Sequence, residues 1–132
     1  MSLPWTRELH AELRAIIERT GPWLLDHPPG PLPMTCLPLV RVGLYVALSA
    51  TDHVRYVGKV NRPGDLRGVA SRFAEHRSRR PQVTAGWARY MVYALSPETP
   101  ETIVIDLEGR LARRCGLPPD GQRSPRPNQV IH

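Results

Sequence analysis

The sequence predicts a single α/β protein of the α+β type, in which a small sheet, made of a hairpin and one further strand, is flanked by helices. Two β-rich runs, residues 39–49 and 53–60, are separated by a short polar break, a pattern that is typical of a hairpin. A third β-rich run covers residues 87–95, and segments with helical periodicity precede, separate and follow these runs. A chain of 132 residues has room for one core with an appendage, but not for two independent cores.

The first expected element is an amphipathic helix over residues 4–20. Its apolar residues recur with a helical period, its charged residues occupy the other side, and Gly21 followed by a proline ends it. The next segment, 22–38, holds six of the fifteen prolines and is interpreted as an extended connector. We therefore expect residues 1–38 to form an N-terminal helical arm, laid on a domain that spans residues 39–132.

Two further helices are predicted inside this domain. Over residues 65–79, apolar side chains occupy one face and arginines lie at or near the other. A last helix is expected to start with Thr99 as N-cap and Pro100 at its first position, and to run to about Cys115. The remaining tail, 117–132, is rich in proline and irregular.

Composition argues against several classes of protein. No apolar stretch approaches the roughly 20 residues of a membrane span, and the N-terminus lacks the apolar region of a signal peptide, so we expect a cytoplasmic protein. The two cysteines, Cys36 and Cys115, are too few for a disulfide scaffold or a four-cysteine zinc site, and both are expected to be reduced. Four histidines without metal-ligand spacing are expected at the surface: His10, His27, His53 and His132.

Positive charge is concentrated in the C-terminal part of the chain. The formal net charge is +6; residues 1–52 contain four arginines and five acids, whereas residues 53–132 contain thirteen arginines, one lysine and seven acids. Such a basic half of the chain suits a polyanionic partner, because contacts with phosphates release counterions and this release favours binding. Arginines outnumber lysine seventeen to one, which a compositional bias alone could produce. Charge by itself therefore leaves nucleic-acid binding and a merely solvated basic surface equally open.

One constellation of residues is more specific. The triplet Gly43-Leu44-Tyr45 lies on the first strand of the predicted hairpin, and the triplet Tyr56-Val57-Gly58 lies on the second, with ten residues between them. Polar residues then follow in order along the chain: Lys59, which is the only lysine, Arg72, His76, Glu108 and Asn128.

This arrangement resembles the GIY-YIG nuclease family, which includes homing endonucleases, some restriction enzymes and the N-terminal module of the bacterial excision-repair nuclease. The resemblance rests on the spacing of the triplets, the Arg72-x-x-x-His76 pair, the segment LEGRL around Glu108 and the PRPN that ends at Asn128. It implies a three-stranded antiparallel sheet with flanking helices, and metal-dependent hydrolysis of phosphodiester bonds, in DNA rather than RNA. It also implies one divalent cation, Mg²⁺ or Mn²⁺, held mainly by Glu108, a hard carboxylate ligand suited to such ions.

The resemblance further implies a role for each residue. Arg72 would grip the scissile phosphate with its guanidinium, and Lys59 would add a positive charge beside it. Tyr45 is the candidate acceptor of the water's proton, which requires nearby cations or the metal to lower its pKa from about 10. Tyr56 and His76 would orient Tyr45 or relay its proton. Asn128 would order the site or a phosphate-bound water.

The partners and the alternatives follow from the same residues. Arginines expected to contact the nucleic-acid backbone are Arg67, Arg77, Arg79 and Arg80. One alternative is a catalytically inactive module that binds nucleic acid on the same fold. Another is a protein-interaction subunit or homodimer, which would use the apolar face of the N-terminal helix between Trp5 and Ile17.

Overall fold

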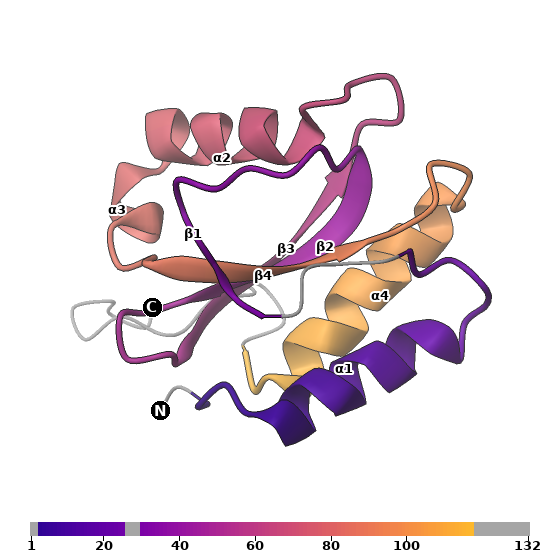
Figure 1. Cartoon of the computed structure of the whole chain (residues 1–132), viewed down its shortest axis with the longest axis horizontal. Coiled ribbons are helices and arrows are strands. Elements are labelled where there is room, and N and C mark those ends of the chain that lie inside the picture. The colour runs from indigo at the N-terminus through magenta and orange to yellow at the C-terminus, as the bar shows by residue number, and fades with distance from the viewer. Residues whose placement is uncertain (1–2, 26–29, 118–132) are drawn as a thin grey trace, which may run out of the picture.

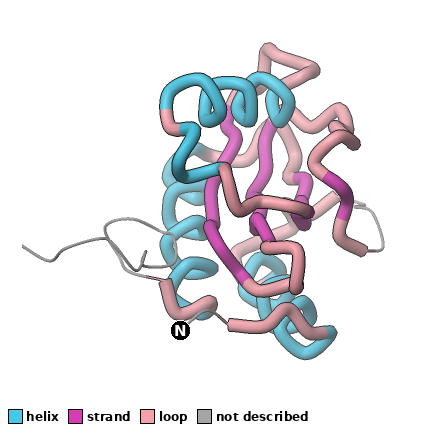
Figure 2. Tube along the Cα trace, turned by 90° about the vertical axis from the view of Figure 1, so that its left-hand side faces the viewer, coloured by secondary structure: helices cyan, strands magenta, loops and turns pink. Residues whose placement is uncertain are grey.

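The computed structural model describes residues 3–25 and 30–117, whose helices and strands form three layers. In chain order the elements are α1 (Arg7–Glu18), β1 (Leu32–Pro33), β2 (Val42–Leu48), β3 (Val54–Asn61), α2 (Gly68–Arg79), α3 (Pro81–Thr84), β4 (Arg89–Ala94) and α4 (Glu101–Arg114). The helices α2 and α3 cover one face of the sheet, and α1 and α4 cover the other (Figure 1). The view turned by 90° also shows helices on both sides of the strands (Figure 2).

The sheet is antiparallel, with the strand order β1-β4-β2-β3. This confirms the α+β class and the predicted hairpin, which is formed by β2 and β3. The expected number of three strands is wrong, because β1 adds a fourth strand to β4 through the pairs Leu32–Tyr90 and Pro33–Arg89. The additional strand lies inside the segment that was interpreted as an extended connector. It has two residues, one of them a proline, and proline is tolerated in a sheet mainly at the edge.

Each face of the sheet buries an apolar core. All seven residues of β2 are buried, because this central strand is covered by helices on both faces. The core under α2, called here the aromatic core, includes Tyr45, Tyr56, Phe73, Trp87 and Tyr90. The opposite core joins residues of the sheet to Leu9, Leu13 and Ile17 of α1 and to Val104, Leu107 and Leu111 of α4.

The N-terminal helix is therefore part of the main core. Thr6 caps it by accepting a hydrogen bond from the Leu9 backbone N–H at 3.0 Å. Its residues Leu13 and Ile17 have no exposed surface. The apolar face of α1, which one alternative assigned to contact with a partner protein, thus packs against α4 and the sheet of the same chain.

The beginning of α2 differs from the expected residue 65. The Asp65 carboxylate accepts hydrogen bonds from the Arg67 backbone N–H and from the Ser71 hydroxyl, both at 2.9 Å. An aspartate that binds backbone two residues on stabilises a turn in place of a helical start. The helix consequently begins at Gly68.

The last helix also begins later than predicted. Pro100 is its N-cap, and Thr99 donates its hydroxyl to the Ser96 carbonyl oxygen at 2.6 Å instead of capping α4. The expected N-cap at Thr99 is therefore wrong. The short helix α3 is an addition to the elements expected from the sequence.

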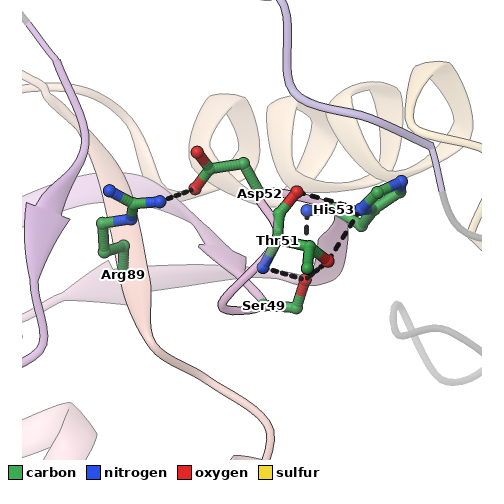
Figure 3. A network of polar contacts seen from close by, with 5 residues as sticks. All are labelled: Ser49, Thr51, Asp52, His53 and Arg89. Atoms are coloured by element: carbon green, nitrogen blue, oxygen red, sulfur yellow. Dashed lines mark hydrogen bonds and ion pairs between the residues drawn. The ribbon is translucent and has the colours of Figure 1, made fainter.

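The turn between β2 and β3 is held by polar contacts (Figure 3). Asp52 has a φ of 59°, and its Oδ1 lies 2.7 Å from Arg89 Nη2 on β4. His53 Nδ1 lies 3.1 Å from the Thr51 hydroxyl oxygen, so this histidine, which was expected at the surface, belongs to the polar network of the turn.

None of the described helices has the length and apolar character needed to span a bilayer. Both cysteines are free thiols, Cys36 exposed and Cys115 buried.

Candidate functional site

Two tyrosines and a histidine meet under α2. Tyr45 on β2 and Tyr56 on β3 both point into the aromatic core, with ring centroids 6.0 Å apart. The Tyr45 hydroxyl lies 2.9 Å from Nε2 of His76, which α2 brings down onto the two rings. The Trp87 ring closes the group at 5.2 Å from Tyr56 and 5.5 Å from His76. Tyr56 and His76 therefore both lie against Tyr45.

The glycines of the two triplets allow close approaches that a side chain would block. Gly58 lies opposite Tyr45 in the hairpin, and a Cβ on Gly58 would lie 2.4 Å from both Cζ and Oη of Tyr45. A Cβ on Gly43 would lie 2.6 Å from the carbonyl oxygen of Tyr93 on β4. Gly58 therefore fixes the position of the Tyr45 ring, and Gly43 fixes the approach of two strands.

Arg72 lies on the same face of the sheet as the two tyrosines, one turn before His76. Its Nη1 is 3.6 Å from Glu75 Oε1, and its side chain is 32% exposed. Glu75 also binds Arg62, so one carboxylate is shared between two guanidinium groups. In the described part of the chain, the buried Nε of Arg72 has no hydrogen-bond acceptor. Arg72 thus keeps an N–H that an anionic ligand could satisfy.

Glu108 lies on α4, across the sheet from α2. Lys59 follows Gly58 on β3 and pairs with Leu44, whose side chain lies in the opposite core, so its side chain points to the α4 face. Its Nζ lies 3.8 Å from Glu108 Oε1. The side chain of Glu108 is 13% exposed, so its carboxylate is largely buried. Glu108 on one face of the sheet and Arg72 on the other flank the same strand, β3, which lies at the edge of the sheet.

The pKa of Tyr45 is raised well above the ordinary value for tyrosine. Burial of the ring is the main cause, and the charges of Tyr56 and Glu108 act in the same direction. The Arg72 guanidinium opposes them through its charge and hydrogen bonding. Arg72 thus lowers the pKa of Tyr45 in the expected direction, but desolvation outweighs it and the net shift is upward.

The pKa of His76 is lowered to about 4, first by burial and then by the charges of Arg72 and Arg80, which Glu75 opposes. The imidazole is therefore neutral at pH 7. A neutral imidazole can accept a hydrogen bond at Nε2 when Nδ1 carries the proton, so Tyr45 can act as the donor.

Exposed arginines lie on both faces of the sheet. On the α1–α4 face, three of them are paired with acids, in Arg14–Glu18, Arg110–Asp106 and Arg114–Glu12, whereas Arg7, Arg19 and Arg113 form no ion pair within the described residues. The four arginines predicted to contact nucleic acid lie on α2 or beside its ends and are exposed, and none forms an ion pair within the described residues: Arg67, Arg77, Arg79 and Arg80. These four unpaired arginines therefore lie together at α2, on the face of the sheet that carries the two tyrosines.

Arg55 belongs to this basic face and was not singled out from the sequence. The register between β2 and β3 shifts between Ala47, which pairs with Tyr56, and Leu48, which pairs with Val54, so Arg55 is the extra residue of a bulge. A Cβ on Gly86, which follows α3, would lie 3.6 Å from both Nε and Nη2 of Arg55. In a regular strand, two residues on the same face have an odd number of residues between them. Val54 and Val57 lie in the same core but have two residues between them, and this irregularity is the only sign of the bulge in the sequence.

Other predicted residues fall elsewhere. His10 is partly buried and not simply at the surface, because its Nδ1 lies 2.8 Å from the hydroxyl of the buried Tyr93. Asn128, His27 and His132 lie outside the described residues.

Among the residues that the structure describes, no group of three or more His, Cys, Asp or Glu side chains could hold a metal ion. Glu108 offers a single carboxylate.

Comparisons with protein-family models, curated proteins and solved structures find no match to this chain. A functional interpretation therefore depends on the residues and their geometry.

Proposed function

We propose that the protein is a metal-dependent endonuclease of the GIY-YIG type, which hydrolyses phosphodiester bonds of nucleic acid, with DNA as the favoured substrate. The observation that carries this proposal is the convergence of Tyr45, Tyr56, Arg72 and His76 on one face of β3, with Glu108 and Lys59 on the other. These six residues come from two strands and two helices, so their proximity is not a result of sequence proximity.

The charge of Arg72 supports phosphate binding. Its guanidinium forms an ion pair with Glu75, and its buried Nε–H has no acceptor among the described residues. A phosphate oxygen would satisfy this donor and would meet a planar group that suits bidentate contacts. Arg72 would then hold the scissile phosphate between the tyrosines and the edge of the sheet.

Glu108 is the residue that would hold the divalent cation. A single carboxylate fits Mg²⁺, because this ion keeps several water ligands and takes phosphate oxygens as others. When bound, the cation supplies charge neutralisation of the phosphate and an activated water. Lys59, 3.8 Å from the carboxylate, balances the charge of Glu108 when the cation is absent.

Tyr45 and His76 would carry the proton of the attacking water as a pair. The water gives a proton to the Tyr45 oxygen while Tyr45 passes its own proton to His76 Nε2, so no tyrosinate forms. The hydroxide oxygen bonds to phosphorus, the bond to the leaving oxygen breaks, and solvent protonates that oxygen. Because Tyr45 is fully buried, the water enters beside Arg72, which is partly exposed. A bound phosphate anion also offsets the charges of Arg72 and Arg80 that depress the pKa of His76.

A second candidate function is a nucleic-acid-binding module without catalysis. It is favoured by the complete burial and the raised pKa of Tyr45, which are equally the properties of a tyrosine that only packs and binds His76. In that case the basic α2 face would still bind phosphates.

Cleavage of fluorescently labelled DNA with Mg²⁺ or Mn²⁺, and its loss on metal removal by EDTA, separates the two functions. The variants Glu108→Gln and Arg72→Ala should each lose roughly 10²–10³-fold in cleavage rate, the usual loss when one group that stabilises transition-state charge is removed. Binding at low salt should persist in Glu108→Gln.

Glu101→Gln is the matched control, since Glu101 is an exposed acid in the first turn of α4. It should cleave like the unmodified protein. If Glu108→Gln and Arg72→Ala also cleave like the unmodified protein, the proposed active site is wrong. DNA binding without cleavage in either metal would favour the non-catalytic module.

A further inference from the structure

We propose that Arg55 and Arg80 form a second phosphate-binding site, which holds the same nucleic-acid strand at a phosphate close to the one bound at Arg72. This inference rests on the proposed function for its ligand. It adds a binding site that lies beyond the six residues assigned to hydrolysis.

The first argument is the alignment of Arg72 and Arg80 along α2, with the neutral His76 between them. Arg72, His76 and Arg80 are spaced by four residues and so share one face of the helix. Arg80 follows the last helical residue, but its N–H still donates to the His76 carbonyl oxygen at 2.8 Å, which keeps it in line with the helix. With a rise of about 1.5 Å per residue, Arg72 and Arg80 are roughly 12 Å apart along the axis.

The second argument is the matching position on β3. Arg55 lies four residues before Lys59, which corresponds to about 13 Å along a strand. The bulge turns Arg55 toward Gly86, just beyond α3. Arg80 is the residue from which α3 starts, so Arg55 and Arg80 flank the same short segment. The lowering of the His76 pKa by the Arg80 charge agrees with the placement of Arg80 on the side of α2 that faces the tyrosines.

The third argument is the absence of neutralising acids at this end. Arg72 shares Glu75 with Arg62, and Lys59 has Glu108. Neither Arg55 nor Arg80 forms an ion pair within the described residues. Two unpaired guanidinium groups beside one short segment attract an anion more strongly than the paired cations at the other end do.

The spacing selects a nucleic-acid strand as the ligand. Phosphates along one nucleic-acid strand are separated both by the rise along the axis and by the winding around it, so cations roughly 12 Å apart can contact two phosphates of the same strand that are a few nucleotides apart at most. An inorganic phosphate or a mononucleotide could occupy only one of the two sites.

The test is the salt dependence of DNA binding by the full chain, measured by fluorescence anisotropy with a labelled duplex in EDTA, with a gel to verify that the duplex stays intact. Each lost phosphate contact lowers the slope of log K against log salt by about 0.9 for duplex DNA. Arg55→Gln and Arg80→Gln should each lower the slope by about that amount, and the double variant by about twice as much. Arg55→Lys should keep the slope, because it keeps the charge.

The matched control is Arg113→Gln on α4, which removes an exposed arginine from the opposite face and should leave the slope unchanged. Thermal unfolding verifies that each variant is folded. If the double variant keeps the slope and the affinity of the unmodified protein, the second site is wrong, and a flat slope in the unmodified protein overturns it as well.

The outcomes also separate this inference from the proposed hydrolysis. A lowered slope without any metal-dependent cleavage supports the second site and overturns the endonuclease. Cleavage that depends on Glu108, together with an unchanged slope in the double variant, supports the endonuclease and overturns the second site.

Discussion

Replacement of Gly58 by alanine tests whether this glycine is needed for the position of Tyr45. The added Cβ would lie 2.4 Å from both Cζ and Oη of Tyr45 and 2.8 Å from Cε2 of Tyr56. Both rings are buried, and Tyr45 packs edge-on against Phe73 at 4.9 Å, so it has little room to move away. The backbone of Gly58 itself has no positive φ, so the effect is one of space and not of backbone strain.

Two terms set the expected size of the effect. Insertion of a methyl group into a well-packed core costs about 1–3 kcal/mol. A displaced Tyr45 hydroxyl also loses its hydrogen bond to His76, which contributes roughly 0.5–1.5 kcal/mol. We therefore expect Gly58→Ala to lower the free energy of unfolding by about 2–4 kcal/mol, and the melting temperature by roughly 10 °C.

Urea unfolding followed by circular dichroism measures this change, and Gly64→Ala is the matched control. A Cβ on Gly64 meets nothing within 4 Å, and its φ is not positive. Gly64→Ala should leave the stability unchanged or raise it by about 0.4–1 kcal/mol, because alanine restricts the unfolded chain. If Gly58→Ala unfolds at the same urea concentration as the unmodified protein, Tyr45 is not confined as described.

Two more predictions concern stability. Because the folded protein keeps His76 neutral with a pKa near 4, whereas the unfolded chain protonates it near 6.5, the free energy of unfolding should fall as the pH drops from about 6.5 to about 4. Each pKa unit corresponds to about 1.4 kcal/mol, so the loss should approach about 3 kcal/mol; His76→Gln should lack this part of the urea-unfolding pH profile, and identical profiles would contradict the assignment. Leu13→Ala should lower the free energy of unfolding by about 2–5 kcal/mol, because Leu13 of α1 is fully buried. Leu39→Ala, at a residue that is 70% exposed, should change it by less than about 0.5 kcal/mol, and equal urea midpoints for the two variants would show that α1 does not share the core.

The elements that were predicted correctly are those with strong periodicity or β-rich composition. The hairpin, the strand after Trp87, and the helices α1, α2 and α4 all have an apolar pattern long enough to be recognised. The strand β1 could not be recognised, because two residues carry no period and their pairing with β4 depends on tertiary contacts. The start of α2 was missed because the Asp65 side chain competes for the backbone, a local effect that periodicity does not report.

The candidate site was partly accessible from the sequence. The resemblance to the GIY-YIG family implied that His76 acts on Tyr45, and the structure brings the two side chains within hydrogen-bond distance. The raised pKa of Tyr45 could not be foreseen, since it depends on how completely three other elements desolvate the ring. Arg55 was missed because a bulge changes the face to which a strand residue points, and one irregular residue leaves almost no pattern.

The edge position of β3 has a consequence for solubility. An exposed edge strand offers unpaired backbone groups onto which a strand of another molecule can add, which is a route to aggregation. Here the N-terminal residues pair with the start of β3, through Trp5 N–H to the Asp52 carbonyl and Val54 N–H to the Leu3 carbonyl, both at 2.8 Å. The bulge and the charged side chains of Arg55 and Lys59 discourage pairing along the part that follows. The residues assigned to phosphate binding thus also keep separate molecules from joining sheet to sheet.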